Sequence, residues 1–416
     1  MSKIRRDKKG YVLRKGEYQR SEDGMYSYAY RDSVGKRRVI YAKSLKDLRE
    51  KEDAITKDRY EGIDSYVAAN ASIDYMFDRY LSTKANLRKS TRSNYVYMYD
   101  RYVRGGFGKR VIGEIHYSDV MKFYLYLMEE KGLKVNTLDS IHTLLHPVFQ
   151  MAVRDEIIRK NPSDGVMAEI KKNNGKNKGK NKGVRSALQK DEQRAFLQFI
   201  SDNPVYGDWF PLFMFLFGTG CRIGETIGIR WEDIDLENRV ISVNHNVTYL
   251  PDYTNGGKCE FRVSLPKTDA GIRTIPMVDE LFDILSEEFS EQMEKGLSDL
   301  EVDGMTGFVF TNRFGGLHHP GCVNKAIERI RTTHNAEEEV KAAKEHRDSV
   351  IIPHFSCHQI RHTFCTRICE SESNLKVIQE IMGHKDIETT MDIYAETTEQ
   401  SKREAVSRLS GNVKIF

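Results

Sequence analysis

One tyrosine near the end of the chain lies in a setting that could make it a nucleophile. The stretch MGHKDIETTMDIYAE, residues 382 to 396, places His384 ten positions before Tyr394. A phenol has a pKa near ~10, so it attacks at neutral pH only where a neighbouring group accepts its proton. The chain has 21 tyrosines, and any one of them is most simply a packing residue. The case for Tyr394 therefore depends on the residues that accompany it.

Two arginines upstream of this stretch could hold an anion. GTGCRIGE places Arg222 after a glycine-rich turn that opens a helix, and a helix N-terminus with a guanidinium is an anion-binding arrangement. HQIRHTF places His358 and Arg361 three residues apart on a predicted helix, so both side chains leave one face of it. We expect His362 to point elsewhere. Each pattern alone is common in purely structural segments.

A lysine and a second histidine pattern also need to be weighed. SLPKTDAGIRTIP puts Lys267 in a turn between two predicted strands, where a lysine is usually solvated. His358 and His362, with Cys357 and Cys365 nearby, could suggest a metal site. That interpretation lacks the glutamate of the zinc-protease signature and a distant matching ligand pair. We therefore predict no metal ion.

The order Arg, Lys, His-x-x-Arg, His, Tyr resembles the active site of the tyrosine recombinases, the phage-integrase family. The residues that carry the resemblance are Arg222, Lys267, His358, Arg361, His384 and Tyr394. TGCRIGETIGIRWEDID and HQIRHTFCTRICE read as the two characteristic boxes of that family, in the expected order. The likeness covers roughly residues 66 to 400. It implies a site-specific DNA recombinase that integrates and excises a mobile element.

The charged residues then have expected roles at a DNA phosphodiester. Its non-bridging oxygens carry negative charge, and the guanidiniums of Arg222 and Arg361 would stabilise the more negative transition state. The resemblance implies that His384 donates a hydrogen bond to the phosphate. Glu225, one turn beyond Arg222, is expected to orient its neighbours.

Covalent chemistry is expected from the remaining three residues. Tyr394 would attack the phosphorus, His358 would accept the phenol proton, and Lys267 would protonate the departing 5′ oxygen. The product is a 3′-phosphotyrosine, which conserves the energy of the phosphodiester. We therefore expect no ATP, metal or other cofactor to be required.

The distribution of charge predicts where the chain meets its partner. The net charge is only +4, but residues 1 to 43 hold 13 Lys and Arg against five Asp and Glu. Residues 171 to 185, KKNNGKNKGKNKGVR, add six Lys and one Arg without an acid. A single charged stretch is more often solvated surface. Two such segments on a near-neutral chain predict a polyanionic partner contacted at two places.

Composition also limits the location of the protein. No run of about 18 apolar residues occurs, so we predict no membrane span. The N-terminal MSKIRRDKKG lacks the apolar stretch of a signal peptide. Six cysteines without paired spacing favour reduced thiols. We expect a bacterial cytoplasmic protein, associated with the nucleoid when bound.

The expected fold class is multidomain, and its first part is small. Three strands, GYVLRK, MYSYAYR and KRRVIYAK, followed by a helix capped at Ser44 predict a β-sheet plus helix over residues 1–62. A sheet can enter a major groove as a helix can. The segment resembles the arm-binding domain of conjugative-transposon integrases. Its candidate DNA contacts are Arg31, Lys36, Arg37 and Arg38.

Three further parts follow along the chain. Apolar residues at helical spacing predict an all-α core-DNA-binding domain over 66–170. Residues 171–186 are expected to form a basic flexible linker, with Lys171, Lys172 and Lys176 as DNA contacts. Residues 187–400 predict a mixed α+β catalytic domain. The tail, 401–416, is interpreted either as frayed or as docking on a neighbouring protomer.

The partners implied by the resemblance are double-stranded DNA, at core-type and arm-type sites, and three further copies of the chain in a tetramer on DNA. An excision factor and a host DNA-bending protein are further candidates. Two alternatives stay open at this point. One is a DNA-binding regulator of the same fold without catalysis, and the other is a topoisomerase that uses the same phosphotyrosine chemistry.

Overall fold

A computed structural model of the chain describes residues 5–31, 35–60, 65–177, 187–252, 258–266, 269–372, 374–388 and 390–391. The chain divides into two units, Met1–Lys182 and Gly183–Phe416. Lys267, Tyr394 and the tail 401–416 lie outside the described residues. Among the described helices, none combines the length and the apolar composition needed to cross a bilayer.

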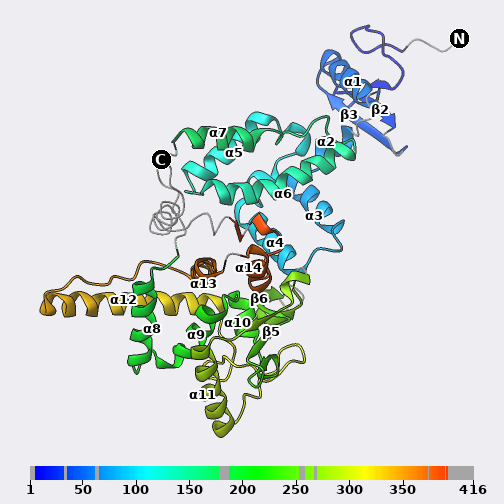
Figure 1. Cartoon of the computed structure of the whole chain (residues 1–416). Coiled ribbons are helices and arrows are strands. Elements are labelled where there is room, and N and C mark those ends of the chain that lie inside the picture. Colours follow the sequence, from blue (N-terminus) through cyan, green and yellow to red (C-terminus); the bar gives the residue numbers. More distant parts are fainter. Residues whose placement is uncertain are drawn as a thin grey trace, which may run out of the picture. The chain divides into compact units, whose positions relative to one another are not determined.

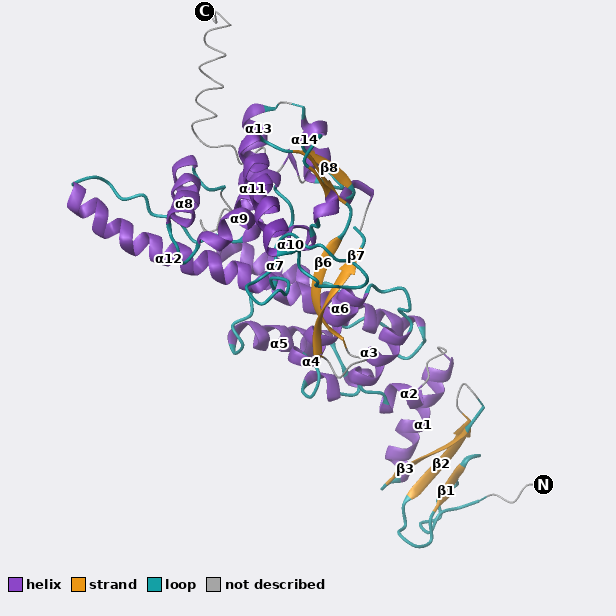
Figure 2. Cartoon of the chain, turned by 90° about the horizontal axis from the view of Figure 1, so that it is seen from below, coloured by secondary structure: helices purple, strands orange, loops and turns teal. Residues whose placement is uncertain are grey.

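The first unit begins with an antiparallel three-stranded sheet of order β1-β2-β3 (Figure 2). The sheet consists of β1 (Glu17–Gln19), β2 (Tyr26–Arg31) and β3 (Arg37–Ala42), followed by the helix α1 (Leu45–Tyr60). The Ser44 hydroxyl caps α1 by accepting a hydrogen bond from the Asp47 amide at 3.1 Å. Tyr26, Ala42 and Leu48 form the buried core between sheet and helix. The predicted architecture is confirmed, but the strand expected at GYVLRK is wrong, because Val12 makes only an isolated bridge to Arg6.

The rest of the first unit is helical, as predicted. Ser72 caps α3 through its side chain, and stacked Phe77 and Tyr99 lie in a core that α6 crosses. Pro147 stands inside α6 without ending it. The helices are α2 (Ser65–Asn70), α3 (Ile73–Ser82), α4 (Lys89–Tyr102), α5 (Tyr117–Glu129), α6 (Val135–Arg154) and α7 (Val166–Asn177) (Figure 1).

The expected linker differs from the structure at its beginning. A flexible segment was predicted from residue 171, whereas α7 continues to Asn177. Val166, Met167 and Ile170 are buried in the helical core, so they anchor the first turns of this helix. An ion pair of 2.9 Å between Lys171 and Asp139 of α6 ties down the next turn. The lysine- and asparagine-rich composition therefore did not prevent a helix whose start is held by packing.

The second unit is a mixed α+β domain. It contains a small antiparallel sheet of order β4-β5-β8 and a separate hairpin of β6 and β7. Its strands are β4 (Ile234–Asp235), β5 (Val240–Val243), β6 (Asn246–Asp252), β7 (Lys258–Ser264) and β8 (Arg273–Pro276). Its helices are α8 (Lys190–Asp202), α9 (Phe210–Thr219), α10 (Ile223–Gly228), α11 (Asp279–Lys295), α12 (Pro320–Glu345), α13 (Cys357–Ser371) and α14 (Leu375–Met382).

Two elements of this unit differ from the sequence expectation. The sequence analysis assigned no helix to 279–295, yet α11 lies there with Leu281 and Leu285 buried against the main core. The apolar and β-branched residues of 307–311 predict a strand, but these residues, all of them described, form none. Phe308 makes only an isolated bridge to Arg230. The core is centred on α9, whose almost wholly apolar sequence is buried, and α9 leads directly into the turn before Arg222.

Candidate active site

Arg361 is the most buried of the predicted catalytic residues that the structure describes. It lies on α13 with only 4% of its surface exposed. Its Nη1 donates to the Gly220 carbonyl at 2.8 Å, and its Nη2 donates to the Met382 carbonyl. Gly220 ends α9 with φ of +59°, and a Cβ there would lie 2.2 Å from Phe364. Only glycine permits this approach, so the turn and the arginine fix one another.

Arg222 reaches the same place from the next turn of the chain. It is the N-cap of α10, and its Nη1 donates to Glu225 Oε1 at 2.8 Å. Its Nη2 lies 3.3 Å from the Gly383 carbonyl, one residue beyond the carbonyl that Arg361 contacts. The Arg222 side chain remains 45% exposed. The structure therefore brings the two predicted guanidiniums together, one buried and one open to solvent.

The proximity of these charges has an electrostatic consequence. Burial, together with the charge of Arg222, lowers the pKa of Arg361 to about 10. Arg361 therefore stays protonated at neutral pH, but a negative ion beside the pair would relieve the repulsion. Such a preorganised pair of cations is suited to an anionic ligand or transition state.

A third arginine, Arg273, lies beside Arg222 and Arg361 and is not among the predicted site residues. Arg273 on β8 donates from Nη2 to Glu225 Oε2 at 2.9 Å, and both side chains are almost fully buried. Burial by itself would raise the pKa of Glu225, but the hydrogen bond and charge of Arg273, with the charge of Arg222, lower it to about 2. The expectation that Glu225 orients its neighbours agrees with these contacts. The signal that could have identified Arg273 is an arginine alternating with Ile275 on the inner face of a short strand.

His384 follows the turn that Arg222 and Arg361 both contact. It is 7% exposed, and its Nδ1 lies 2.9 Å from the Thr390 hydroxyl. Burial, followed by the charges of Arg361 and Arg222, lowers its pKa to about 4. The imidazole is therefore neutral at pH 7. In the tautomer in which the Thr390 hydroxyl donates to Nδ1, the ring proton lies on Nε2, from which it can be donated to an anion.

This environment predicts an unusual titration. In the DNA-free protein, the His384 ring should remain neutral down to about pH 4, since burial and neighbouring guanidiniums both oppose the cation. NMR of the imidazole C–H resonances, assigned with His384→Gln, measures this midpoint. Arg222→Gln should raise the midpoint, and Arg230→Gln, which alters a different ion pair, should not. A midpoint near ~6.5 would contradict the described electrostatics.

His362, the second histidine on α13, lies beside His358 and does not point elsewhere as the sequence predicts. His358 is exposed in the first turn of α13, and its ring contacts that of His362 edge to face at a centroid distance of 5.2 Å. The prediction that His362 points elsewhere is therefore wrong, because residues four apart on a helix are neighbours. The charge of His362 also contributes to the lowered pKa of His384. His362 thus belongs to the surroundings of the site.

Lys267 and Tyr394 lie outside the described residues, but residues close to each of them in the chain are described. The carbonyl oxygen of Ala270, three residues after Lys267, lies close to Gly383. A Cβ added to Gly383 would be only 2.8 Å from that oxygen. Gly383 has φ of +63°, so this close packing and the backbone conformation both require glycine. The described residues end at Met391, which follows Thr390 and precedes Tyr394 by three positions.

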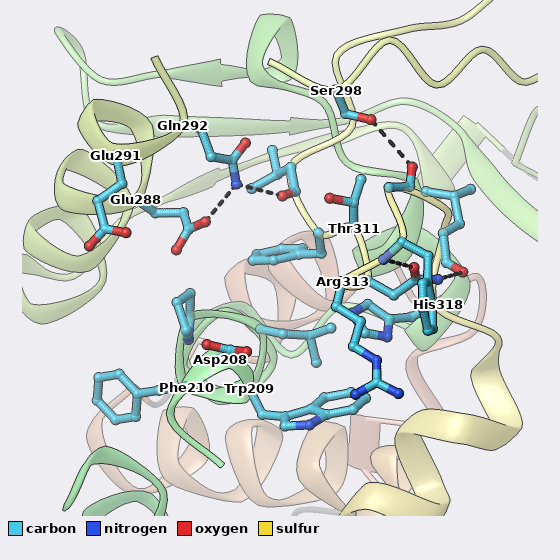
Figure 3. Close-up of a pocket in the computed structure, with 18 of the residues that line it drawn as sticks. Asp208, Trp209, Phe210, Glu288, Glu291, Gln292, Ser298, Thr311, Arg313 and His318 are labelled. Atoms are coloured by element: carbon cyan, nitrogen blue, oxygen red, sulfur yellow. Dashed lines mark hydrogen bonds between the residues drawn. The ribbon is translucent and has the colours of Figure 1, made fainter. Parts of the chain in front are cut away.

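Other groups and cavities do not change the assignment of the site. Within the part of the chain that the structure describes, no cluster of three or more His, Cys, Asp or Glu is arranged to hold a metal ion. A cavity of about 1860 Å³ lies between α11 and the segment around Trp209 and His318 (Figure 3). None of the predicted catalytic residues is among the described residues that line it.

The predicted DNA contacts of the N-terminal sheet divide between its two faces. Arg31 pairs with Arg37 across β2 and β3, and both are exposed on the face that also carries Tyr41. Arg38 pairs with Tyr30 and therefore shares the opposite face, toward α1. Lys36 is exposed, one residue before β3 begins.

The basic residues near the end of the first unit lie on a helix. Lys171 and Lys172 are exposed on α7, with Lys171 paired to Asp139. Lys176 lies in the last turn of the same helix.

A β-sheet domain with a helix, an all-α domain and an α+β domain with clustered arginines together define the class of tyrosine-type DNA recombinases. The model of the phage integrase family matches residues 186–401, and the model of the DNA-binding domain of Tn916 integrase matches residues 1–59. The chain belongs to the phage integrase family. It is a tyrosine recombinase, an enzyme that breaks and rejoins DNA strands.

The most informative relatives are transposon proteins. The chain is 29% identical to the transposase from transposon Tn916 of Enterococcus faecalis over 423 aligned residues, 99% of this chain and 98% of the relative. The transposase from transposon Tn1545 of Streptococcus pneumoniae is similar to the same degree. The structure also resembles that of the Tn1549 transposon integrase in complex with a circular intermediate DNA, with a TM-score of 0.67 and 27% identity over 81% of this chain and 99% of that one.

Proposed function

We propose that this recombinase integrates and excises a mobile element of the conjugative-transposon kind, with Arg222, Arg361 and His384 binding the scissile phosphate. The observation that carries the proposal is the convergence of both guanidiniums on neighbouring carbonyls, Met382 and Gly383, immediately before His384. Three hydrogen-bond donors from separate segments thus face one region. Arg222 is partly exposed, so DNA can reach its guanidinium directly.

The chemistry of the proposed reaction involves two proton transfers. The Tyr394 oxygen bonds to phosphorus while His358 accepts its proton, and the 5′ oxygen leaves with a proton from Lys267. The two arginines and His384 stabilise the charge on the non-bridging oxygens. The two transfers then run in reverse: a 5′ hydroxyl of another strand attacks the phosphotyrosine and gives its proton to Lys267, while the phenol departs with the proton from His358. Each step exchanges one phosphate ester for another, so no external energy source is needed.

The relatives support the wider setting of the proposal. The matched Tn1549 integrase structures hold circular intermediate DNA and transposon right end DNA. By analogy, the substrates of this chain are the ends of its own element and the joined circular form. We propose that four protomers assemble on core-type sites in the bacterial cytoplasm while the N-terminal sheet holds arm-type sites. The tail 401–416 is proposed to dock on a neighbouring protomer, and an excision factor and a DNA-bending protein are proposed as accessory partners.

Recombination of defined DNA tests this function. A plasmid that carries the joined ends of the element, incubated with a second duplex that carries a target site, should yield products in which the two are covalently joined. A topoisomerase would relax supercoils without joining duplexes, and a silent regulator would shift the DNA in a gel without breaking it. Either of the last two results would replace the proposed function.

The N-terminal sheet predicts a specific dependence on salt. If Arg31 and Arg37 contact phosphates, replacing both by alanine in the full chain should reduce the slope of log affinity against log salt for arm-site DNA by about 0.9 for each. Arg38→Ala is the matched control, because Arg38 lies on the other face of the sheet. Equal slopes for wild type and the double variant would remove this face as the DNA contact.

A further inference from the structure

The centre of the site contains a buried ion pair that does not itself face the solvent. The side chains of Arg273 and Glu225 are 4% and 6% exposed, and their charged atoms lie 2.9 Å apart. Burying two charges has a large desolvation cost, which is offset only where the geometry and the remaining hydrogen bonds are good. The main effect of such a pair is therefore expected on the position of neighbouring residues, and not on the stability of the fold.

The remaining donors of Arg273 connect separate parts of the chain. Its Nε donates to the Ile381 carbonyl at 2.8 Å, three residues before His384. Its Nη1 lies 3.3 Å from the Gly271 carbonyl, in the segment that follows Lys267. With Glu225 as the third partner, one guanidinium contacts the three segments that carry Arg222, Lys267 and His384.

Glu225 passes this restraint to Arg222. One carboxylate oxygen accepts from Arg222 Nη1 at 2.8 Å, and the other accepts from the Arg222 backbone amide at 2.9 Å and from Arg273. An ionised carboxylate can accept all of these hydrogen bonds, whereas a protonated one cannot. The charged or titratable groups whose fields reach Glu225 are Arg222, Arg273, Arg361 and the Cys221 thiol.

We propose that Arg273 is a positioning residue for DNA cleavage, which holds Glu225 against Arg222 and fixes the turn at residues 381–384 without touching the phosphate. This inference rests on the proposed function, because the groups that it positions are the proposed phosphate ligands. A guanidinium is required, since its planar fork directs donors to three partners at once. A lysine ammonium at this position could not span Ile381, Gly271 and Glu225 together.

Cleavage by the full chain tests the inference on a suicide substrate, whose nick lets the cut fragment diffuse away. Single-turnover rates at saturating DNA are measured for wild type, Arg273→Gln and Arg273→Lys, together with DNA affinity and thermal unfolding. The matched control is Arg230→Gln, since Arg230 is also largely buried and paired with carboxylates but contacts none of the proposed catalytic segments through its ion pairs.

The expected result is a loss of rate without a comparable loss of binding. Misplacement of a reacting group by about 1 Å can reduce the rate ~10²-fold, so both Arg273 variants should cleave on the order of 10²-fold more slowly with nearly unchanged affinity. The ratio of the wild-type rate to the Arg273→Gln rate should in addition grow as the pH falls, since removal of the main cationic partner raises the pKa of the buried Glu225. Glu225 of the wild type, with a pKa of about 2, should stay ionised over the pH range of the assay, and titration of His358 affects both proteins alike.

Each outcome distinguishes this inference from the proposed function. Wild-type rates and pH profiles in Arg273→Lys and Arg273→Gln, with wild type cleaving normally, would overturn the inference alone. So would a loss no larger than that of Arg230→Gln, which would indicate a purely structural ion pair. If Arg273→Gln does not fold, Arg273→Lys, which retains the charge, decides the question by its rate at unchanged affinity. Failure of the wild type to form an adduct would overturn the proposed function, and this inference with it.

Discussion

A Tyr394→Phe variant should bind DNA as tightly as the wild type and form no covalent complex with it. The substitution removes a single oxygen atom, the proposed nucleophile, and leaves the aromatic ring for packing. On a nicked suicide substrate in buffer with EDTA, the wild type should accumulate a protein–DNA adduct while the variant accumulates none. Formation of the adduct without divalent metal is part of the prediction, because the proposed electrostatic groups are guanidiniums.

The remaining tyrosines provide the alternative for this experiment. The chain has 21 tyrosines, and an adduct in both proteins would move the nucleophile to another of them. Absence of an adduct in both, with binding retained at a verified site, would favour a silent DNA-binding protein. Binding measured beside cleavage separates a loss of chemistry from a loss of folding.

Arg361→Lys is expected to reduce the cleavage rate by ~10³–10⁵-fold, the range for a catalytic arginine in phosphoryl transfer. Arg361 donates from both terminal nitrogens to the turns at Gly220 and Met382, and a single ammonium cannot reproduce that geometry. A lysine buried beside Arg222 would also have its pKa lowered, so part of the population would lose the charge. Single-turnover cleavage at saturating DNA measures the effect.

The matched control for this variant lies on the same helix. Arg367 pairs with Glu370 at 2.9 Å and donates to the Leu188 carbonyl, away from the Gly220 and Met382 turns. Arg367→Lys should change the cleavage rate by no more than about threefold, as expected for a substitution outside the site. A rate for Arg361→Lys within tenfold of wild type would contradict the role assigned to the guanidinium.

Local patterns were sufficient to predict part of the site. Arg222 follows a glycine turn at a helix start, and Arg361 lies in a short motif on one helix, so local sequence determines the element that carries each of them. Their convergence was suggested by the resemblance, and the structure describes it through Gly220, Met382 and Gly383.

Arg273 could not be identified in the same way. Its partners Glu225 and Ile381 are 48 and 108 residues away along the chain. Ile381 meets it because α14 packs against β8, and Glu225 reaches it from α10. The alternation of Arg273 with Ile275 places both on one face of a short strand, but because an arginine is usually exposed, this local signal is weak on its own. Such long-range packing is not encoded in any window of the sequence.

The helix α11 and the continuation of α7 to Asn177 also differ from the prediction made from the sequence, and both differences have local causes. The helix α11 carries Leu281 and Leu285 four residues apart and has an acidic first turn, so its sequence does contain a helical periodicity. The start of α7 is held by buried apolar residues, and the composition of the following lysine-rich stretch obscured its continuation to Asn177. In both cases the apolar spacing was a better guide than the polar residues around it.

The most direct test of the central claim is to identify the residue that carries DNA in the trapped adduct. Trypsin cleavage after Lys385 and Lys402 releases a peptide, residues 386–402, in which Tyr394 is the one tyrosine. Mass spectrometry of the nuclease-treated adduct should find the 3′-linked nucleotide on this peptide, attached to Tyr394. A nucleotide on any other tyrosine, or a break in the DNA without a covalent intermediate, would contradict the account.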